Sequence, residues 1–301
     1  MFKHLLVPLD GSQLAESVLP AVVYLARDTG ASVTLLHVIE RDAPQEVHGE
    51  HHLTNADDAC IYLGQVAERT FPPEMRLSIV EHVHTVEVGN VAQSIVEHVG
   101  EFAPDLIVLC SHGSGGLRDF LYGSIAQQVI ALGKTPVLVI EPEGKMPDAG
   151  YRRTLMPLDG NPDHEQSIPI VTDLVKACGA SLHLLVVVPT PDTLTPQQAA
   201  TGRLLPSTTN AILELAQEDA VAYLRDKLDQ LKAEGLTVSA EVARGDPTAA
   251  IVATAERIGA DLIVLGTHGK AGWDAFWAGS VTPKIADRTR RHLLLVPVRG
   301  R

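Results

Sequence analysis

The 301-residue chain has few cysteines and no long apolar segment, the features that mark disulfide-rich and membrane-spanning proteins. Its three cysteines, Cys60, Cys110 and Cys178, are widely spaced and form no CxxC pair, so we expect reduced thiols rather than a disulfide framework. No apolar run approaches the roughly 18 residues that a membrane helix needs. The N-terminal MFKHLLVP has no signal-peptide pattern. These features predict a cytoplasmic protein with no membrane partner.

Basic and aromatic residues are also scarce. Lysine and arginine number 24 against 37 acidic residues, which gives a net charge of −13, and no run of five or more basic residues occurs. Because phosphate neutralisation supplies much of the affinity for nucleic acid, this charge argues against a nucleic-acid partner. With only 4% aromatics, the cores must be built from Val, Leu, Ile and Ala, which suits buried parallel strands.

What the chain does contain is a long internal repeat. Residues 2–38 align without a gap on residues 151–187, an offset of 149, and residues 104–124 align on residues 260–280, an offset of 156. The repeat unit is far too long for a solenoid, so the chain is a duplicated domain. A length about twice the ~150-residue prior for one domain agrees with this interpretation.

The predicted domains are residues 1–143 and 151–301, joined by a short Pro- and Gly-bearing linker. Strands and helices alternate in the first domain: strands at 3–9, 32–39, 76–86, 105–110 and 136–140, and helices at 13–28, 53–70, 91–102 and 119–132. Pro20 should kink the first helix, and Gly30 should end it. This alternation predicts an α/β fold with a doubly wound parallel sheet, whose ligand lies at the carboxyl ends of the strands.

One loop has the composition of a phosphate site. In the second domain, Gly266-Thr267-His268-Gly269 follows the fourth strand, and Gly279-Ser280 comes after nine further residues. Glycines let backbone N–H groups approach an anion, and the serine hydroxyl adds a donor. The spacing matches neither a Walker A loop nor a GxGxxG fingerprint. The alternative to a phosphate site is that the two halves share this loop only because they share an ancestor, and that the loop binds no ligand.

The motifs LLVPLDGS at 5–12, TLLHV at 34–38 and the G-x2-G-x9-G-S loop together resemble the universal stress protein family, present here as two tandem domains. The resemblance implies two doubly wound domains, each a five-stranded parallel sheet in the order 3-2-1-4-5 with helices on both faces. It also implies an internal pseudo-dimer of the two halves, and a homodimer as in many members. Some members bind ATP, and members without the loop glycines do not.

The resemblance also implies particular ligand contacts in the second domain. Asp159 would hold the adenosine moiety, the backbone of Val187 would contact adenine, and the loop glycines and serine would hold the phosphates. The implied nucleotide site comprises Pro157, Leu158, Asp159, Val187, Gly266, Gly269, Gly279, Ser280 and Val281.

The equivalent residues of the first domain are Asp10, Val38, Gly113, Gly123 and Ser124. There Cys110 stands in the place of Gly266, where its side chain would crowd the phosphates or forbid a positive φ. We therefore expect ATP, with or without Mg²⁺, mainly in the second domain.

Several titratable residues allow a catalytic interpretation as well as a structural one. Asp10 and Asp159 could act as general bases, but a carboxylate at this place more often binds ribose or base. His112 and His268 could be acid–base groups, or could fix the loop geometry, which we favour. Since no residue resembles an activated nucleophile, we assign no catalytic residue and expect at most slow ATP hydrolysis.

No metal site is assigned from the sequence. His48, His51 and His52 lie close together, but their spacing fits no standard zinc pattern. His82 and His84 share one face of a strand and are interpreted as surface residues. Cys110 could be a redox-sensitive thiol, although an inert buried thiol is favoured.

The sequence thus favours an ATP-binding regulatory protein of the stress response, in which bound nucleotide alters the surface offered to an unknown protein partner. One alternative is a ligand-free interaction scaffold. The other is an enzyme that processes adenine nucleotides, for which Lys270 and His268 are the candidate catalytic residues.

Overall fold

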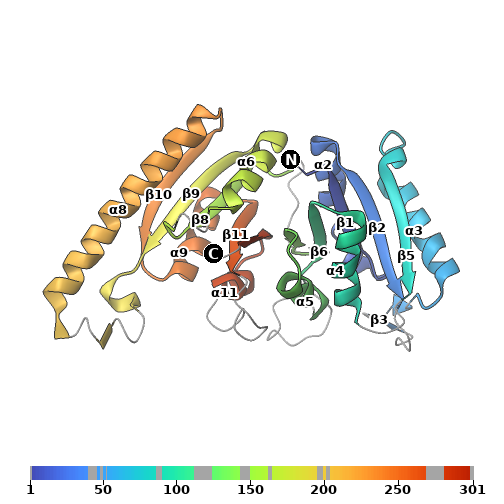
Figure 1. Cartoon of the computed structure of the whole chain (residues 1–301), viewed down its shortest axis with the longest axis horizontal. Helices are drawn as coiled ribbons and strands as arrows, with labels where there is room; N and C mark the ends of the chain where they lie inside the picture. The colour runs from blue at the N-terminus through green and yellow to red at the C-terminus, as the bar shows by residue number, and fades with distance from the viewer. Residues whose placement is uncertain are drawn as a thin grey trace. The chain divides into compact units, whose positions relative to one another are not determined.

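The computed structural model (Figure 1) describes residues 2–39, 46–47, 50–51, 53–85, 90–111, 124–142, 150–161, 165–194, 199–200, 204–268 and 281–298. The chain divides into two compact units. Unit 1 comprises Met1–Gly150 together with Arg290–Pro297, and unit 2 comprises Tyr151–Thr289 together with Val298–Arg301. The chain thus passes from unit 1 to unit 2 at Gly150, inside the predicted linker.

Unit 1 contains a parallel sheet with the strand order β5-β2-β1-β6-β7. This is the predicted order 3-2-1-4-5. The C-terminal strand β12 (His292–Val298) pairs antiparallel with β7, with Leu294 opposite Leu138. The other elements are β1 (His4–Pro8), α1 (Gln13–Glu16), α2 (Leu19–Thr29), β2 (Ser32–Ile39), β3 (Glu46–Val47), β4 (Glu50–His51), α3 (Ala56–Thr70), η1 (Arg76–Ser78), β5 (Ile79–Thr85), α4 (Val91–Phe102), β6 (Leu106–Cys110), α5 (Ser124–Leu132) and β7 (Val137–Ile140).

Unit 2 repeats this plan with four parallel strands in the order β10-β9-β8-β11. Its elements are β8 (Arg153–Leu158), α6 (Ser167–Cys178), β9 (Ser181–Val188), η3 (Pro191–Thr193), α8 (Pro206–Ala233), β10 (Val238–Arg244), α9 (Pro247–Ile258), β11 (Leu262–His268) and α11 (Val281–Arg288). None of the helices in the described part of the chain is both long and apolar enough to cross a bilayer.

Helices cover both faces of the sheet in unit 1, as the alternation of side chains along β5 shows. Glu81 points toward α3. Its carboxylate lies about 3.5 Å from the position that a Cβ would take on Gly64, which is a residue of α3. The next residue, His82, faces the other way and contacts His98 on α4. Since successive strand residues point to opposite faces, α3 and α4 cover opposite sides of the sheet. The predicted doubly wound fold is confirmed.

Of two helix signals read from the sequence, Gly30 acts as expected and Pro20 does not. The helix predicted over 13–28 is divided into α1 and α2, with Pro20 in the first turn of α2, where its missing N–H costs nothing. Gly30 ends α2 in the left-handed conformation, with φ 69°. The predicted kink is therefore a complete break between two helices.

A repeated aspartate ties the first strand of each unit to the fourth. In unit 1, Asp105 Oδ2 accepts hydrogen bonds from the backbone nitrogens of Lys3 (2.6 Å) and His4 (3.0 Å). In unit 2, Asp261 Oδ2 accepts them from Arg152 (2.8 Å) and Arg153 (3.1 Å). These bonds hold the amino ends of the two central strands in register.

Candidate functional site

The first strand of each unit ends in the same tight turn. Gly11 and Gly160 have φ values of 94° and 76°, a region that favours glycine. Asp10 Oδ1 accepts hydrogen bonds from the backbone N (2.9 Å) and Oγ (2.7 Å) of Ser12. Asp159 Oδ1 accepts one from the backbone N of Asn161 (3.0 Å). The turns thus place both carboxylates at the carboxyl ends of central strands.

Val187 lies beside Asp159 on the neighbouring strand. The register of β8 and β9 pairs Leu158 with Val186, so Val187 is level with Asp159. Peptide groups along a strand point alternately toward its two neighbours. Because Val188 O accepts a hydrogen bond from Gly245 beyond the end of β10, the peptide groups of Val187 point the other way, toward β8. Since β8 has ended there, these groups face the Asp159 turn.

Gly266 lies on the other side of β8, in β11. The pairing of Ile263 with Leu155 places Gly266 level with Leu158. A Cβ on Gly266 would lie 3.0 Å from Cγ2 of Val298, which is tighter than an ordinary contact. The φ angle of Gly266 lies outside the left-handed region. The expectation that this position needs a positive φ is therefore wrong. The glycine is needed for space inside a strand.

The equivalent Cys110 is accommodated differently. It is the last residue of β6, is half-buried and pairs with Ile140 on β7. Cys60, Cys110 and Cys178 form no disulfide bond with one another. The first domain therefore carries a thiol at the strand end where the second carries a bare backbone.

The remaining predicted phosphate contacts are at or beyond the limits of the described residues. Val281 is the first residue of α11, and Ser124 is the first residue of α5. The helices α5 and α11 therefore begin at these two residues. Gly113, Gly123, Gly269, Gly279 and Ser280 lie outside the described residues, as do His48, His52, His112 and Lys270.

The two turns differ in what surrounds them. A Cβ on Gly11 would lie 3.1 Å from Cδ1 of Leu53, whereas none of the described atoms lies within 4 Å of a Cβ on Gly160. Buried His37 lies between two carbonyl oxygens, with Nδ1 2.7 Å from that of Leu9 and Nε2 3.2 Å from that of Leu53, and its neutral ring can donate to one of them. In unit 1, the chain at Leu53 therefore closes over the end of β1.

A tyrosine–carboxylate cluster beside each turn was not identified from the sequence. In unit 2, Glu165 accepts a hydrogen bond from Tyr223 (2.9 Å) and pairs with Lys227 (2.5 Å). Burial, then Glu165 and Asp159, raise the pKa of the Tyr223 hydroxyl well above its ordinary value.

The first domain has the matching set. Glu16 pairs with Arg69 (2.5 Å), and burial followed by Glu16 and Asp10 raises the pKa of Tyr62. The repeated glutamates at the 149 offset were the available sequence signal. The tyrosines come from helices preceded by loops of different length, so no alignment reveals them.

The interpretation of His82 and His84 as surface residues does not hold. Both are half-buried, and their rings lie against His98, which comes from α4. This histidine cluster lies on β5 and α4, apart from the strand ends that carry Asp10 and Asp159.

Comparison with known proteins shows which family the chain belongs to. The model of the universal stress protein family matches residues 1–141 and again residues 150–297. The chain belongs to the universal stress protein family. The two matches confirm that it is a tandem member of the family, with one copy in each half.

Individual relatives agree with this architecture. The universal stress protein YxiE of Bacillus subtilis is 27% identical over 164 residues, covering 46% of this chain and 99% of its own length. The universal stress protein MT2698 of Mycobacterium tuberculosis is 23% identical over 309 residues, covering 97% of this chain and 95% of its own. A solved universal stress protein from Archaeoglobus fulgidus has a TM-score of 0.67 at 20% identity over 98% of each chain, which shows the shared fold.

Proposed function

We propose that this universal stress protein binds ATP in unit 2 and acts as a nucleotide-dependent regulator in the stress response. The observation that carries the proposal is the position of Val187 and Asp159. Beyond the end of β8, the peptide groups of Val187 face an exposed carboxylate at the same level of the sheet. A peptide N–H and C=O can bond the edge of an adenine ring, and a carboxylate can accept hydrogen bonds from ribose hydroxyls.

Unit 2 suits a ligand better than unit 1 at this place. Val187 is half-buried and Asp159 is exposed, whereas the matching Val38 is buried and Asp10 is half-buried, next to Gly11, which lies against Leu53. A nucleotide over Asp10 would have to displace the chain at Leu53, whose carbonyl oxygen lies 3.2 Å from Nε2 of His37. We therefore assign the nucleotide to unit 2 and not to unit 1.

The phosphates are assigned to the loop that joins β11 to α11. Gly266 lies near the carboxyl end of β11 and has no side chain, and α11 begins at Val281, directly after Gly279-Ser280 in the sequence. The backbone N–H groups in the first turn of a helix are unpaired within the helix and attract anions. Gly269, Gly279 and Ser280 would hold the phosphates together with this helix start, and Mg²⁺ would neutralise part of their charge.

Occupancy of this site would be the signal. Bound nucleotide would order the phosphate loop and change the surface offered to a protein partner. A ligand-free scaffold is the competing function, in which the loop glycines are inherited without a role. The partner, the cytoplasmic location and a homodimer stay predictions.

Equilibrium titration of the full chain tests the proposal. We expect calorimetry to give one ATP per chain, and GTP to bind more weakly because the base is recognised by a fixed peptide edge. Mass spectrometry of protein purified under native conditions should find an adenine nucleotide. A chain that neither retains nor binds ATP would instead be the scaffold. Turnover of ATP near ordinary enzyme rates, about 10 s⁻¹, would contradict the regulatory role.

A further inference from the structure

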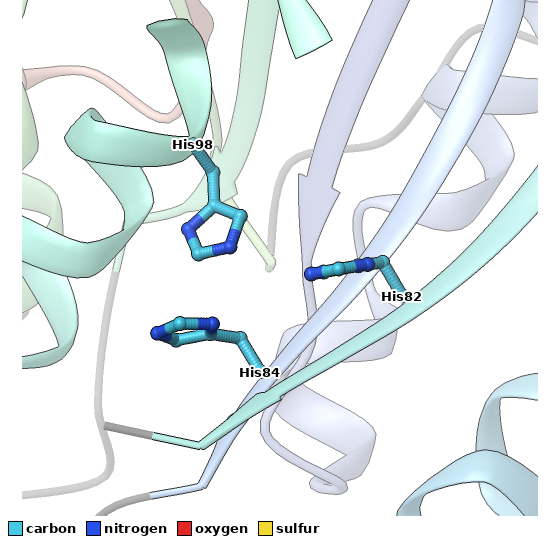
Figure 2. Close-up of side chains that lie close together, drawn as sticks. All are labelled: His82, His84 and His98. Carbon is cyan, nitrogen blue, oxygen red and sulfur yellow. The ribbon is translucent and has the colours of Figure 1, made fainter. Parts of the chain in front are cut away.

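Three histidines converge between β5 and α4 of unit 1. His82 and His84 come from β5 and His98 comes from α4, and Figure 2 shows their rings turned toward a common space. One ring nitrogen from each residue can be chosen so that all three lie within 4.8 Å of one another. The ring centroids of His84 and His98 are 4.3 Å apart, and those of His82 and His98 are 5.1 Å apart.

The local fold fixes the direction of each ring. Residues 82 and 84 are two apart on a strand, so both point to the face that α4 covers. On α4, His98 Nδ1 lies 2.7 Å from the carbonyl of Ser94. Because a carbonyl only accepts hydrogen bonds, Nδ1 carries the proton and Nε2 keeps its lone pair. A backbone carbonyl that orients an imidazole in this way is typical of metal-binding histidines.

His82 supplies an independent observation. Its Nε2 is buried and has no hydrogen-bond partner among the described residues. Buried polar atoms without a partner are rare in folded proteins, and such an atom at the centre of a histidine cluster indicates that something else binds it. Burial and the neighbouring His98 lower the pKa of His82 and of His84, although Glu101 opposes this effect. The neutral imidazole is the form that binds metals.

We propose that His82, His84 and His98 form a binding site for a divalent transition-metal ion, Zn²⁺ above all. Three imidazoles with one further ligand make a common zinc site. Glu101 is placed to be the fourth ligand, since its Oε2 lies 3.7 Å from Nε2 of His98. Zn–N bonds of about 2.0–2.1 Å put tetrahedral nitrogens roughly 3.4 Å apart, so the side chains must close by about 1 Å.

Unit 2 shows that the fold does not itself require these histidines. The strand registers and the 156 offset place Glu241 at the position of His82, Ala243 at that of His84 and Thr254 at that of His98. There Glu241 accepts a hydrogen bond from Thr254 Oγ1 (3.1 Å) and pairs with Arg257. An ion pair fills the place in unit 2, whereas unit 1 presents converging lone pairs.

Zinc titration of the full chain, measured by competition with a chromophoric chelator, tests the proposal. We expect one Zn²⁺ to bind with micromolar or tighter affinity, and His84→Ala to weaken it by about 100-fold or more. Alanine is the residue that unit 2 carries at this position, and His84 is only half-buried, so this variant should fold. Co²⁺ in place of Zn²⁺ should give the visible absorption of a tetrahedral site in the original chain and not in the variant.

Two control variants separate this site from other imidazoles. His183→Ala removes a partly buried strand histidine in unit 2, and the triple change of His48, His51 and His52 to alanine removes the other histidine-rich segment. Both should keep the zinc affinity of the original chain. The proposal fails if the original chain binds no zinc, if His84→Ala binds it equally well, or if only the triple variant loses it. Binding of ATP is measured separately, so either proposal can fail without the other.

Discussion

Unit 1 and unit 2 share one strand order, yet they differ at the two places where polar side chains could meet a ligand. At the end of the first strand, unit 1 is closed by Leu53, whereas unit 2 leaves Asp159 exposed. Between the edge strand and the next helix, unit 1 has three histidines, whereas unit 2 has an ion pair. The two halves therefore differ at both places for which a ligand is proposed.

What the halves retain is what builds the sheet. Asp105 and Asp261 bind the amino end of the first strand in the same way, and Gly11 and Gly160 make the same turn at its carboxyl end. These residues satisfy backbone groups or allow a positive φ, and few other residue types can do so. The proposed nucleotide residues are also mostly shared, since Asp10 matches Asp159 and Val38 matches Val187. Among the positions compared, only Cys110 differs, standing where the second half has Gly266.

The largest expected effect concerns the two turn aspartates. Asp159→Ala should weaken ATP binding by roughly 10- to 100-fold, the equivalent of losing a charged hydrogen bond. Asp10→Ala is the matched control and should change the affinity less than about twofold. Calorimetry on the full chain checks both. Equal losses in the two variants would contradict the assignment of the nucleotide to unit 2.

Exchange of the residues at the end of the fourth strand sharpens the same comparison. Gly266→Cys should destabilise unit 2 by about 1–3 kcal/mol, because the new Cβ would lie 3.0 Å from Val298, and it should also weaken ATP binding. Cys110→Gly should cost unit 1 about 1 kcal/mol or less through chain entropy. Chemical denaturation measures both costs. If Gly266→Cys left the free energy of unfolding unchanged, Val298 would be shown to move aside freely.

The repeated aspartates should have smaller and similar effects. Asp261→Asn removes charge-assisted bonds to the backbone of Arg152 and Arg153, while burial raises the pKa of this carboxyl and so offsets part of their gain. We expect a loss of about 1 kcal/mol. Asp105→Asn is the matched change in unit 1, and Asp105 is more exposed, so its loss should be no larger. The denaturation midpoint of each variant tests this order.

The smallest effect is the pH dependence of unit 1 without metal. His82 and His84 have pKa values lowered by burial and by His98, against opposing effects from Glu101 and, for His84, Glu97. Below the unfolded value of about 6.5, the unfolded chain therefore binds more protons than the folded one. Stability should fall as the pH is lowered from 7 through this range. In the presence of a chelator, His84→Ala should show a shallower slope than the original chain.

Much of the fold was predictable because backbone signals are local. The Gly30 helix end and the alternation of strands and helices followed from residue type and spacing, whereas the kink predicted at Pro20 is a break between α1 and α2 that precedes it. The boundaries were less accurate where a signal was ambiguous. The strand predicted over 76–86 begins with a 3-10 turn at Arg76–Ser78, since its hydrophobic pattern does not distinguish the two.

The candidate site was predictable only in part. The roles of Asp159 and Val187 were implied by the family resemblance, and the strand register places the two residues at the same level. The reason given for Gly266 was half wrong, because a φ angle and a contact with Val298 are set by packing. The Tyr223–Glu165 bond joins residues 58 apart, and no spacing rule predicts such a contact.

By itself, the sequence determined the duplication, the α/β class, the turn glycines and the family, because each of these depends on residue order or on conformational preferences of single residues. Only the tertiary structure decided that Leu53 lies against Gly11, that Asp159 stays open to solvent and that His98 meets His82 and His84. These are distances between segments remote in sequence, and they follow from how helices pack on a sheet.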